Sequence, residues 1–178
     1  MFRIHALPLA LALLSGTARA ADRFAATLFT EVNAYRDSQR VGLLDHNAAL
    51  SEAADIEATW TNLALRRGYR LAFHTTDTAW LLAERPDLRW ERLYATYGPV
   101  LPAELGIHDV ARLCGYSGLC RDNIGLANKT PANAVTGWAR STSGHRENML
   151  DPAWTELGTG HKGGGQDAVC VAVFGDAL

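Results

Sequence analysis

The stretch SGHRENMLDPAWTELGTG, residues 143–160, contains the pattern that decides the fold. Ser143 can cap a short helix, which would place His145 in the first helical turn. Residues 154–160 then predict a strand, three consecutive glycines predict a turn, and the valine-rich residues 168–174 predict a second strand. The chain therefore closes in a β-hairpin that follows directly on a short helix.

Upstream of this hairpin, apolar residues recur at helical spacing. In the segment 47–67, the stripe of apolar residues is mostly core, although it contains the charged Glu57. Helices are predicted over residues 22–40, 47–67, 79–83 and 88–97, and again from Thr130-Pro131 onward. Helices followed by a terminal hairpin predict an α+β domain, with helices packed on a mainly antiparallel sheet.

Composition agrees with one globular domain and excludes several classes of protein. The chain has 178 residues, of which 48% are hydrophobic and 20% are charged. This mixture excludes collagen-like, coiled-coil and wholly disordered chains. With 17 basic against 19 acidic residues there is no positive excess, so a nucleic-acid partner is not expected.

The N-terminus predicts an export signal over residues 1–20. Arg3 supplies the positive end, residues 7–14 form an apolar run, and Ala18-Arg19-Ala20 is a small-x-small cleavage site. The run is too short to cross a hydrocarbon core of about 30 Å, so no membrane span is expected to be retained. The protein is therefore expected to be secreted or periplasmic. The alternative is a buried N-terminal helix.

The three cysteines fit an exported protein with one disulfide. Cys114 and Cys120 flank a glycine-containing loop that can bring them within bonding range, and we predict that they pair. Cys170 lies in the last apolar run and is predicted to be a buried free thiol. An exchange of partners that involves Cys170 stays open.

Residues 143–160 resemble the signature of the CAP superfamily, the cysteine-rich secretory, antigen 5 and pathogenesis-related proteins, and above all its small bacterial secreted members. Residues 32–36, 122–125 and 173–175 resemble three further family motifs in the expected order. The resemblance implies an α-β-α sandwich, with helices on both faces of a small sheet. It also implies a single domain over residues 21–178 with an insertion around residues 75–120.

The resemblance further implies a cleft lined by two histidines and two acidic residues, which in some members holds a divalent metal. The histidines correspond to His74 and His145, and one acidic position corresponds to Asp122. The second acidic position falls on Ser141, which cannot ionise. Two imidazoles and one carboxylate still form a three-ligand set suited to zinc or a similar ion. We therefore expect His74, Asp122 and His145 to converge.

Two classes of function follow. The first is a secreted binding module whose ligand is a lipid, a cell-wall glycan or a protein partner. The alternative is a metal-dependent hydrolase that uses His74 and His145. The missing second carboxylate and the lack of a nucleophile motif favour the binding module over an enzyme. The aromatic residues of the insertion can line a groove or pack on the sheet, and packing is favoured; they are Trp80, Trp90, Tyr94 and Tyr97.

Glu156 is predicted to be a structural residue outside the cleft. Its carboxylate is expected to accept hydrogen bonds from the helix start at Ser143-Gly144 and so to brace the loop of His145.

Overall fold

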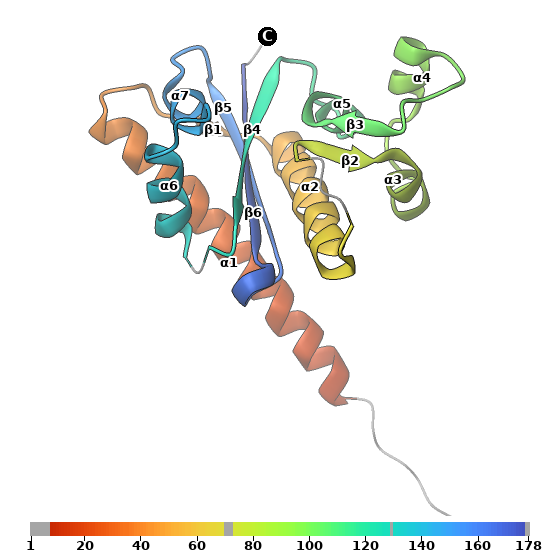
Figure 1. The fold of residues 1–178 in the computed structure, drawn as a ribbon, viewed down its shortest axis with the longest axis horizontal. Helices are drawn as coiled ribbons and strands as arrows, with labels where there is room; N and C mark the ends of the chain where they lie inside the picture. The colour runs from red at the N-terminus through yellow and green to blue at the C-terminus, as the bar shows by residue number, and fades with distance from the viewer. Residues whose placement is uncertain (1–7, 70–72, 129, 177–178) are drawn as a thin grey trace, which may run out of the picture.

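The protein is built around a small mixed sheet with helices on both faces. The computed structural model describes residues 8–69, 73–128 and 130–176. Four strands form the sheet in the order β1 (Asp45–His46), β5 (Glu156–Lys162), β6 (Val169–Gly175) and β4 (Cys120–Leu126). β1 runs parallel to β5, and the other two pairs are antiparallel. Figure 1 shows the helices on either side of this sheet, which confirms the predicted α-β-α sandwich.

β6 separates the two halves of the core because its side chains alternate between the two faces. Val169, Val171 and Val173 pack on one side with the second helix. Cys170 and Phe174 pack on the other side with the first helix. Every residue of β6 is buried, so helices must cover both faces of the sheet.

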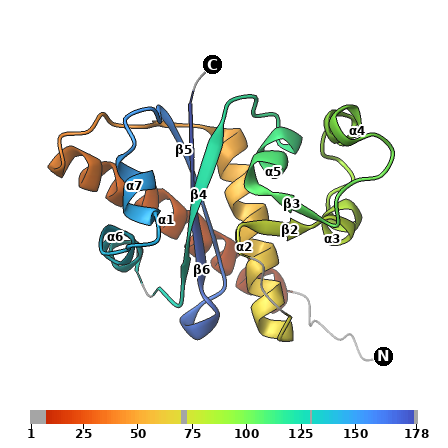
Figure 2. The same ribbon diagram turned by 45° about the horizontal axis from the view of Figure 1, so that its top comes forward.

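Two groups of helices provide that cover. On one face lie α1 (Pro8–Ser38), α6 (Pro131–Ala139) and α7 (His145–Leu150). On the other face lie α2 (Ala48–Arg67) and α5 (Ile107–Leu113). Figure 2 shows the same division from a second direction. None of the described helices is long and apolar enough to span a membrane.

Helix α2 has the clearest sequence signals and the closest contact with the sheet. The Asn47 side chain accepts hydrogen bonds from the backbone N–H groups of Ala49 and Leu50, and Gly68 ends the helix at a φ of 66°. The helix packs on β5 at Gly158 and Gly160, where an added Cβ would meet the backbone of α2. The backbones lie this close because both positions lack a side chain.

Residues 75–120, predicted to be an insertion, contain a second, two-stranded sheet and three short helices. β2 (Thr75–Asp77) pairs antiparallel with β3 (Glu104–Gly106). Between them lie α3 (Thr78–Glu84) and α4 (Glu91–Tyr97), close to the predicted ranges, and α5 follows β3. Trp90 is buried in the core, whereas Tyr94 and Tyr97 are exposed. Packing in the core therefore accounts for Trp90 but not for the exposed Tyr94 and Tyr97.

The sequence did not predict five of the strands and α-helices, namely β1, β2, β3, β4 and α5. β1 to β3 have two or three residues each, which is too short for a periodic pattern. Helix α1 also begins earlier than the predicted residue 22, at Pro8. The first seven residues of the predicted export signal lie outside the described residues. The cleavage site stays a prediction.

The predicted Cys114–Cys120 disulfide is absent: these two cysteines and Cys170, all described, are free. The loop between Cys114 and Cys120 is anchored on the C-terminal segment, because Asp176 accepts hydrogen bonds from the Tyr116 hydroxyl and the Leu119 backbone N–H. Burial also raises the pKa of both thiols to about 12, which suppresses the reactive thiolate. The prediction of a buried, free Cys170 is confirmed.

Thiol counting tests this arrangement. Ellman titration of the denatured protein without reductant is expected to find three thiols per chain, because all three cysteines are free. A count of one would restore the disulfide that the sequence suggested.

Candidate functional site

His74 and Asp122 line a pocket of about 270 Å³. His74 directly precedes β2 and has a φ of 68°, a conformation that is uncommon for residues other than glycine. Asp122 is on β4 and is buried. The His74 Nδ1 atom lies 2.6 Å from Asp122 Oδ2. This short contact ties the second sheet to the central one.

A network of amides fixes the third predicted residue, His145, beside this pair. The Asn123 side chain donates to the backbone carbonyl of His145 at 2.9 Å. The Asn148 side chain donates to the backbone carbonyl of Asp122 and to Asn123 Oδ1. The Trp154 indole N–H donates to Asn148 Oδ1. Helix α7 is therefore held against β4 at the position of Asp122.

His145 is the first residue of α7 and lines the same pocket as His74 and Asp122. The two imidazole centroids are 6.4 Å apart. Burial lowers the pKa of His145, and the nearby His74 lowers it further. The structure thus brings together His74, Asp122 and His145, as predicted from the sequence. The lowered pKa of His145 favours the neutral form of its ring at neutral pH.

Two expected residues have different roles. Gly144, at a φ of 92°, is the N-cap of α7, and Ser143 makes no side-chain cap. Ser143 instead donates its backbone N–H to the Ser141 hydroxyl oxygen. Ser143 lines the pocket, whereas Ser141 does not. The second acidic position therefore does not correspond in space to Ser141.

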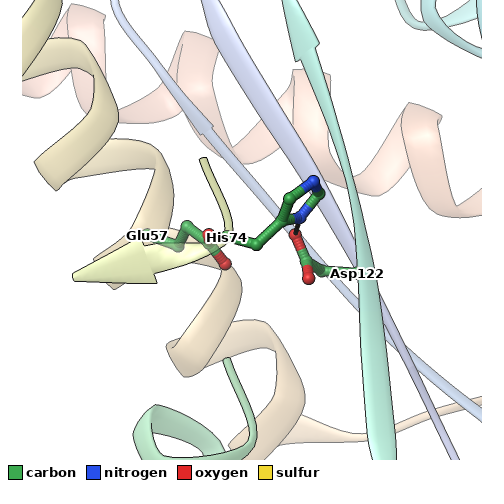
Figure 3. Close-up of side chains that lie close together, drawn as sticks. All are labelled: Glu57, His74 and Asp122. Carbon is green, nitrogen blue, oxygen red and sulfur yellow. Dashed lines mark hydrogen bonds and ion pairs between the residues drawn. The ribbon is translucent and has the colours of Figure 1, made fainter. Parts of the chain in front are cut away.

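The carboxylate that completes the cluster is Glu57 on α2, which sequence reasoning placed in the core. Its side chain is 1% exposed, and neither carboxylate oxygen has a hydrogen-bond partner among the described residues. Figure 3 shows Glu57 extending from α2 toward the His74–Asp122 pair. One ligand atom from each of Glu57, His74 and Asp122 fits within 4.8 Å of the others. The sequence signal for the role of Glu57 was its charge within an otherwise apolar helical stripe.

The electrostatics of the cluster favour the protonated forms of Glu57 and His74. Burial raises the pKa of Glu57 well above its ordinary value, and the adjacent Asp122 raises it further. The hydrogen bond to Asp122 raises the pKa of His74, partly offset by burial. Two carboxyl groups and an imidazole around a small volume are a donor set that zinc accepts. The buried, unpartnered oxygens of Glu57 fit such an ion, because a cation would satisfy them.

The model of the cysteine-rich secretory protein (CAP) family matches residues 29–174. The chain belongs to the CAP family. No curated protein matches it. The matched range includes the pocket residues His74, Asp122 and His145 and also the buried Glu57, so the whole site lies within the CAP domain.

Solved structures share the fold of this CAP domain at low sequence identity. An extracellular protein from Bacillus anthracis str. Ames with an SCP domain is 19% identical, with a TM-score of 0.60 over 88% of this chain and 41% of its own. A cysteine-rich secretory protein from Staphylococcus aureus subsp. aureus Mu50 is 14% identical, with a TM-score of 0.52 over 88% and 39%. An outer surface protein from Borrelia burgdorferi is 13% identical, with a TM-score of 0.56 over 86% and 92%. The chain spans about two fifths of the first two proteins.

Glu156 contacts different partners from those predicted. Its two carboxylate oxygens accept hydrogen bonds from the Asn47 side chain and the Tyr116 hydroxyl, both at 2.9 Å. Asn47 caps α2, and Tyr116 belongs to the loop before β4. In this CAP domain Glu156 therefore joins β5 to the start of α2 and to that loop. These contacts replace the predicted contact with residues 143–144.

The raised pKa of Glu57 predicts the pH dependence of a Glu57→Gln variant in metal-free protein. Between the unfolded pKa, about 4.3, and the higher folded pKa, the unfolded chain loses a proton that the folded chain keeps. The stability of the wild type therefore falls as pH rises through this window, and glutamine removes that loss. Urea unfolding at about pH 4.5 and about pH 8 should show the variant gaining stability over wild type as pH rises. Glu52→Gln, on the same helix, is the control. A pH-independent difference for Glu57→Gln would contradict the prediction.

Proposed function

We propose that this CAP-domain protein is an exported binding protein that holds a divalent cation, such as zinc, through Glu57, His74 and Asp122. The buried carboxylate of Glu57 is the observation that carries the proposal. A buried charge is costly unless it is paired, hydrogen-bonded or bound to a metal. Its two oxygens lack partners among the described residues, although the imidazole of His74 and the carboxylate of Asp122 lie beside it.

The cation would connect side chains from three elements, of which only His74 and Asp122 are hydrogen-bonded to each other. Glu57 would contribute from α2, His74 from the segment before β2, and Asp122 from β4. A bound cation of this type polarises carbonyl and phosphoryl oxygens of a ligand. His145 lines the pocket and has a lowered pKa, which favours its neutral form, and it would accept a hydrogen bond from the same ligand or donate one to it.

Export rests on the predicted signal over residues 1–20 and on two observations. Figure 1 shows the first turns of α1 projecting beyond the sheet and the other helices, and among the described side chains of α1 the first to pack on the core is Phe24. Removal of residues 1–20 would therefore leave the described core intact. Two similar structures are named as an extracellular protein and an outer surface protein.

Metal analysis of the purified protein tests the cation site. Plasma mass spectrometry is expected to find one divalent cation per chain, which a chelator removes and added zinc restores. Glu57→Gln and Asp122→Asn should each weaken zinc binding at least about tenfold, because each removes a ligand. Glu52→Gln should leave zinc affinity unchanged, since Glu52 pairs with Arg85 outside the cluster. Equal zinc affinity in all variants would refute the site.

The alternative function is a metal-dependent hydrolase. The favouring observation is the neutral imidazole of His145 in the same pocket as His74, since a neutral imidazole can accept a proton from an attacking water. Zinc-loaded protein would then hydrolyse p-nitrophenyl esters, and His145→Ala would lose that activity while it kept its zinc. Equal slow hydrolysis by wild type and His145→Ala would exclude this function for His145.

A further inference from the structure

A second recess lies along the outer face of α2, apart from the His74 pocket. It consists of two hollows of about 590 and 600 Å³ that meet at Thr59, Trp80 and Glu84, which line both. We call it the α2 groove. Figures 1 and 2 show α2 and α3 on the same side of the central sheet, and Trp80 comes from α3. Among the described residues, none lines both this groove and the His74 pocket.

The charges in the α2 groove are separated along the helix. The first hollow is lined by the carboxylates of Glu52, Asp55 and Glu84. Its one arginine, Arg85, is already bound to Glu52 at 2.6 Å and to Asp87 at 2.8 Å. The first hollow is therefore negative.

The second hollow has the opposite charge. It is lined by Arg66, Arg67 and Lys162, against the single carboxylate of Glu84. Within the described part of the chain, the side chains of Arg66, Lys162 and Glu84 make no hydrogen bond or ion pair. These charged groups are therefore free to bind a ligand.

Trp80 forms an apolar wall where the two halves meet. Its ring packs on Trp60 with the centroids 5.2 Å apart, and its backbone N–H is held by the Asp77 carboxylate at 2.7 Å. The contact with Trp60 supports the indole on one side, and the bond to Asp77 holds the backbone that carries it. A fixed aromatic surface binds an apolar side chain at little entropic cost.

The separation of the charges indicates the length of the ligand. Glu52 and Arg66 are fourteen positions apart on α2, which at 1.5 Å per residue is about 20 Å. An extended peptide spans about 3.3–3.6 Å per residue, so about six residues cover this distance. A zwitterionic lipid headgroup has its two charges much closer together, and an acidic glycan would be repelled by the first hollow.

We propose that the α2 groove binds a short extended peptide, with its ammonium end at Glu52 and Asp55, Glu84 at the junction of the two hollows, and its carboxylate end at Arg66, Arg67 and Lys162. The proposal does not depend on the metal site, because Glu57 points toward His74 and lines neither hollow of the groove.

The test uses the full-length protein and the hexapeptide GAFAAE with free termini. Its binding is followed by the NMR signal of the Trp80 indole N–H, which a Trp80→Phe variant assigns. A saturable shift of this signal is expected. Acetylation of the peptide's N-terminus and replacement of its glutamate by glutamine with C-terminal amidation should each weaken binding about three- to fivefold.

Variants assign each peptide end to its half of the groove. Glu52→Gln, which changes a residue of the first hollow alone, should weaken binding of the free peptide and have little effect on the acetylated one. The double variant Arg66→Gln/Lys162→Gln should weaken binding of the free peptide and have little effect on the neutralised one. Glu57→Gln should bind the peptide as wild type does. A lack of any saturable shift, or affinity unchanged by both peptide modifications, would overturn the proposal. If binding needed the carboxylates of the peptide but tolerated acetylation of its N-terminus, the groove would be a plain anion site. That result would also overturn the proposal.

Discussion

Gly158→Ala is expected to lower the free energy of unfolding by about 3 kcal/mol or more. A Cβ at this position would meet the backbone carbonyl carbon of Leu50 and the backbone nitrogen of Ser51. A rotamer change cannot relieve a backbone contact, so α2 would have to move away from β5. The free energy of unfolding of a native domain is only about 5–15 kcal/mol, so a loss of this size removes a large share of the stability.

Gly137→Ala is the matched control, because nothing lies within 4 Å of an added Cβ there. Gly137 is in the interior of α6, where alanine is expected to stabilise the helix by about 0.5–1 kcal/mol. Urea unfolding of both variants measures the two effects. If Gly158→Ala were as stable as wild type, the close approach of α2 to β5 would be wrong.

Arg36→Met is expected to destabilise the protein by about 3–5 kcal/mol, because buried polar groups lose their partner. The Arg36 side chain is 1% exposed. It donates to the backbone carbonyls of Gly42, Met149, Asp151 and Trp154, at distances from 2.6 to 3.5 Å. One side chain therefore joins the end of α1 to the end of α7 and to the segment that leads into β5.

Arg23→Met, an exposed position on the same helix, should change stability by no more than about 0.5 kcal/mol. Because Met149 and Asp151 lie at the end of α7, Arg36→Met should also loosen the helix that begins with His145. Hydrogen exchange of the α7 amides measures this local effect. Unchanged exchange in α7 together with full stability would contradict the role of Arg36.

The elements with strong local signals were predictable from the sequence. Asn47 and Gly68 bound α2 within a residue of the expected 47–67, and Thr130 caps α6 as predicted. The hairpin of β5 and β6 was also predicted, because alternation and glycines mark it. The two-residue β1 was not predictable, since its parallel pairing with β5 depends on residues far apart in the chain.

The candidate site was only partly predictable for the same reason. Motif resemblance identified His74, Asp122 and His145, which all line one pocket. Counting along the chain assigned the fourth position to Ser141, whereas the structure provides a carboxylate from α2. A linear motif cannot show that Glu57 on one helix faces β4. Its place in an apolar stripe was the signal, because an isolated buried carboxylate needs a functional or structural reason.

We propose that Glu57, His74 and Asp122 bind one divalent cation. Anomalous diffraction at the zinc absorption edge, from crystals of the wild-type protein grown with zinc, tests it most directly. We expect one strong peak in contact with the carboxylates of Glu57 and Asp122 and the imidazole of His74, and no such peak in Glu57→Gln crystals. A map without a peak at these residues, or with zinc bound by His74 and His145 while Glu57 stays unliganded, would contradict it.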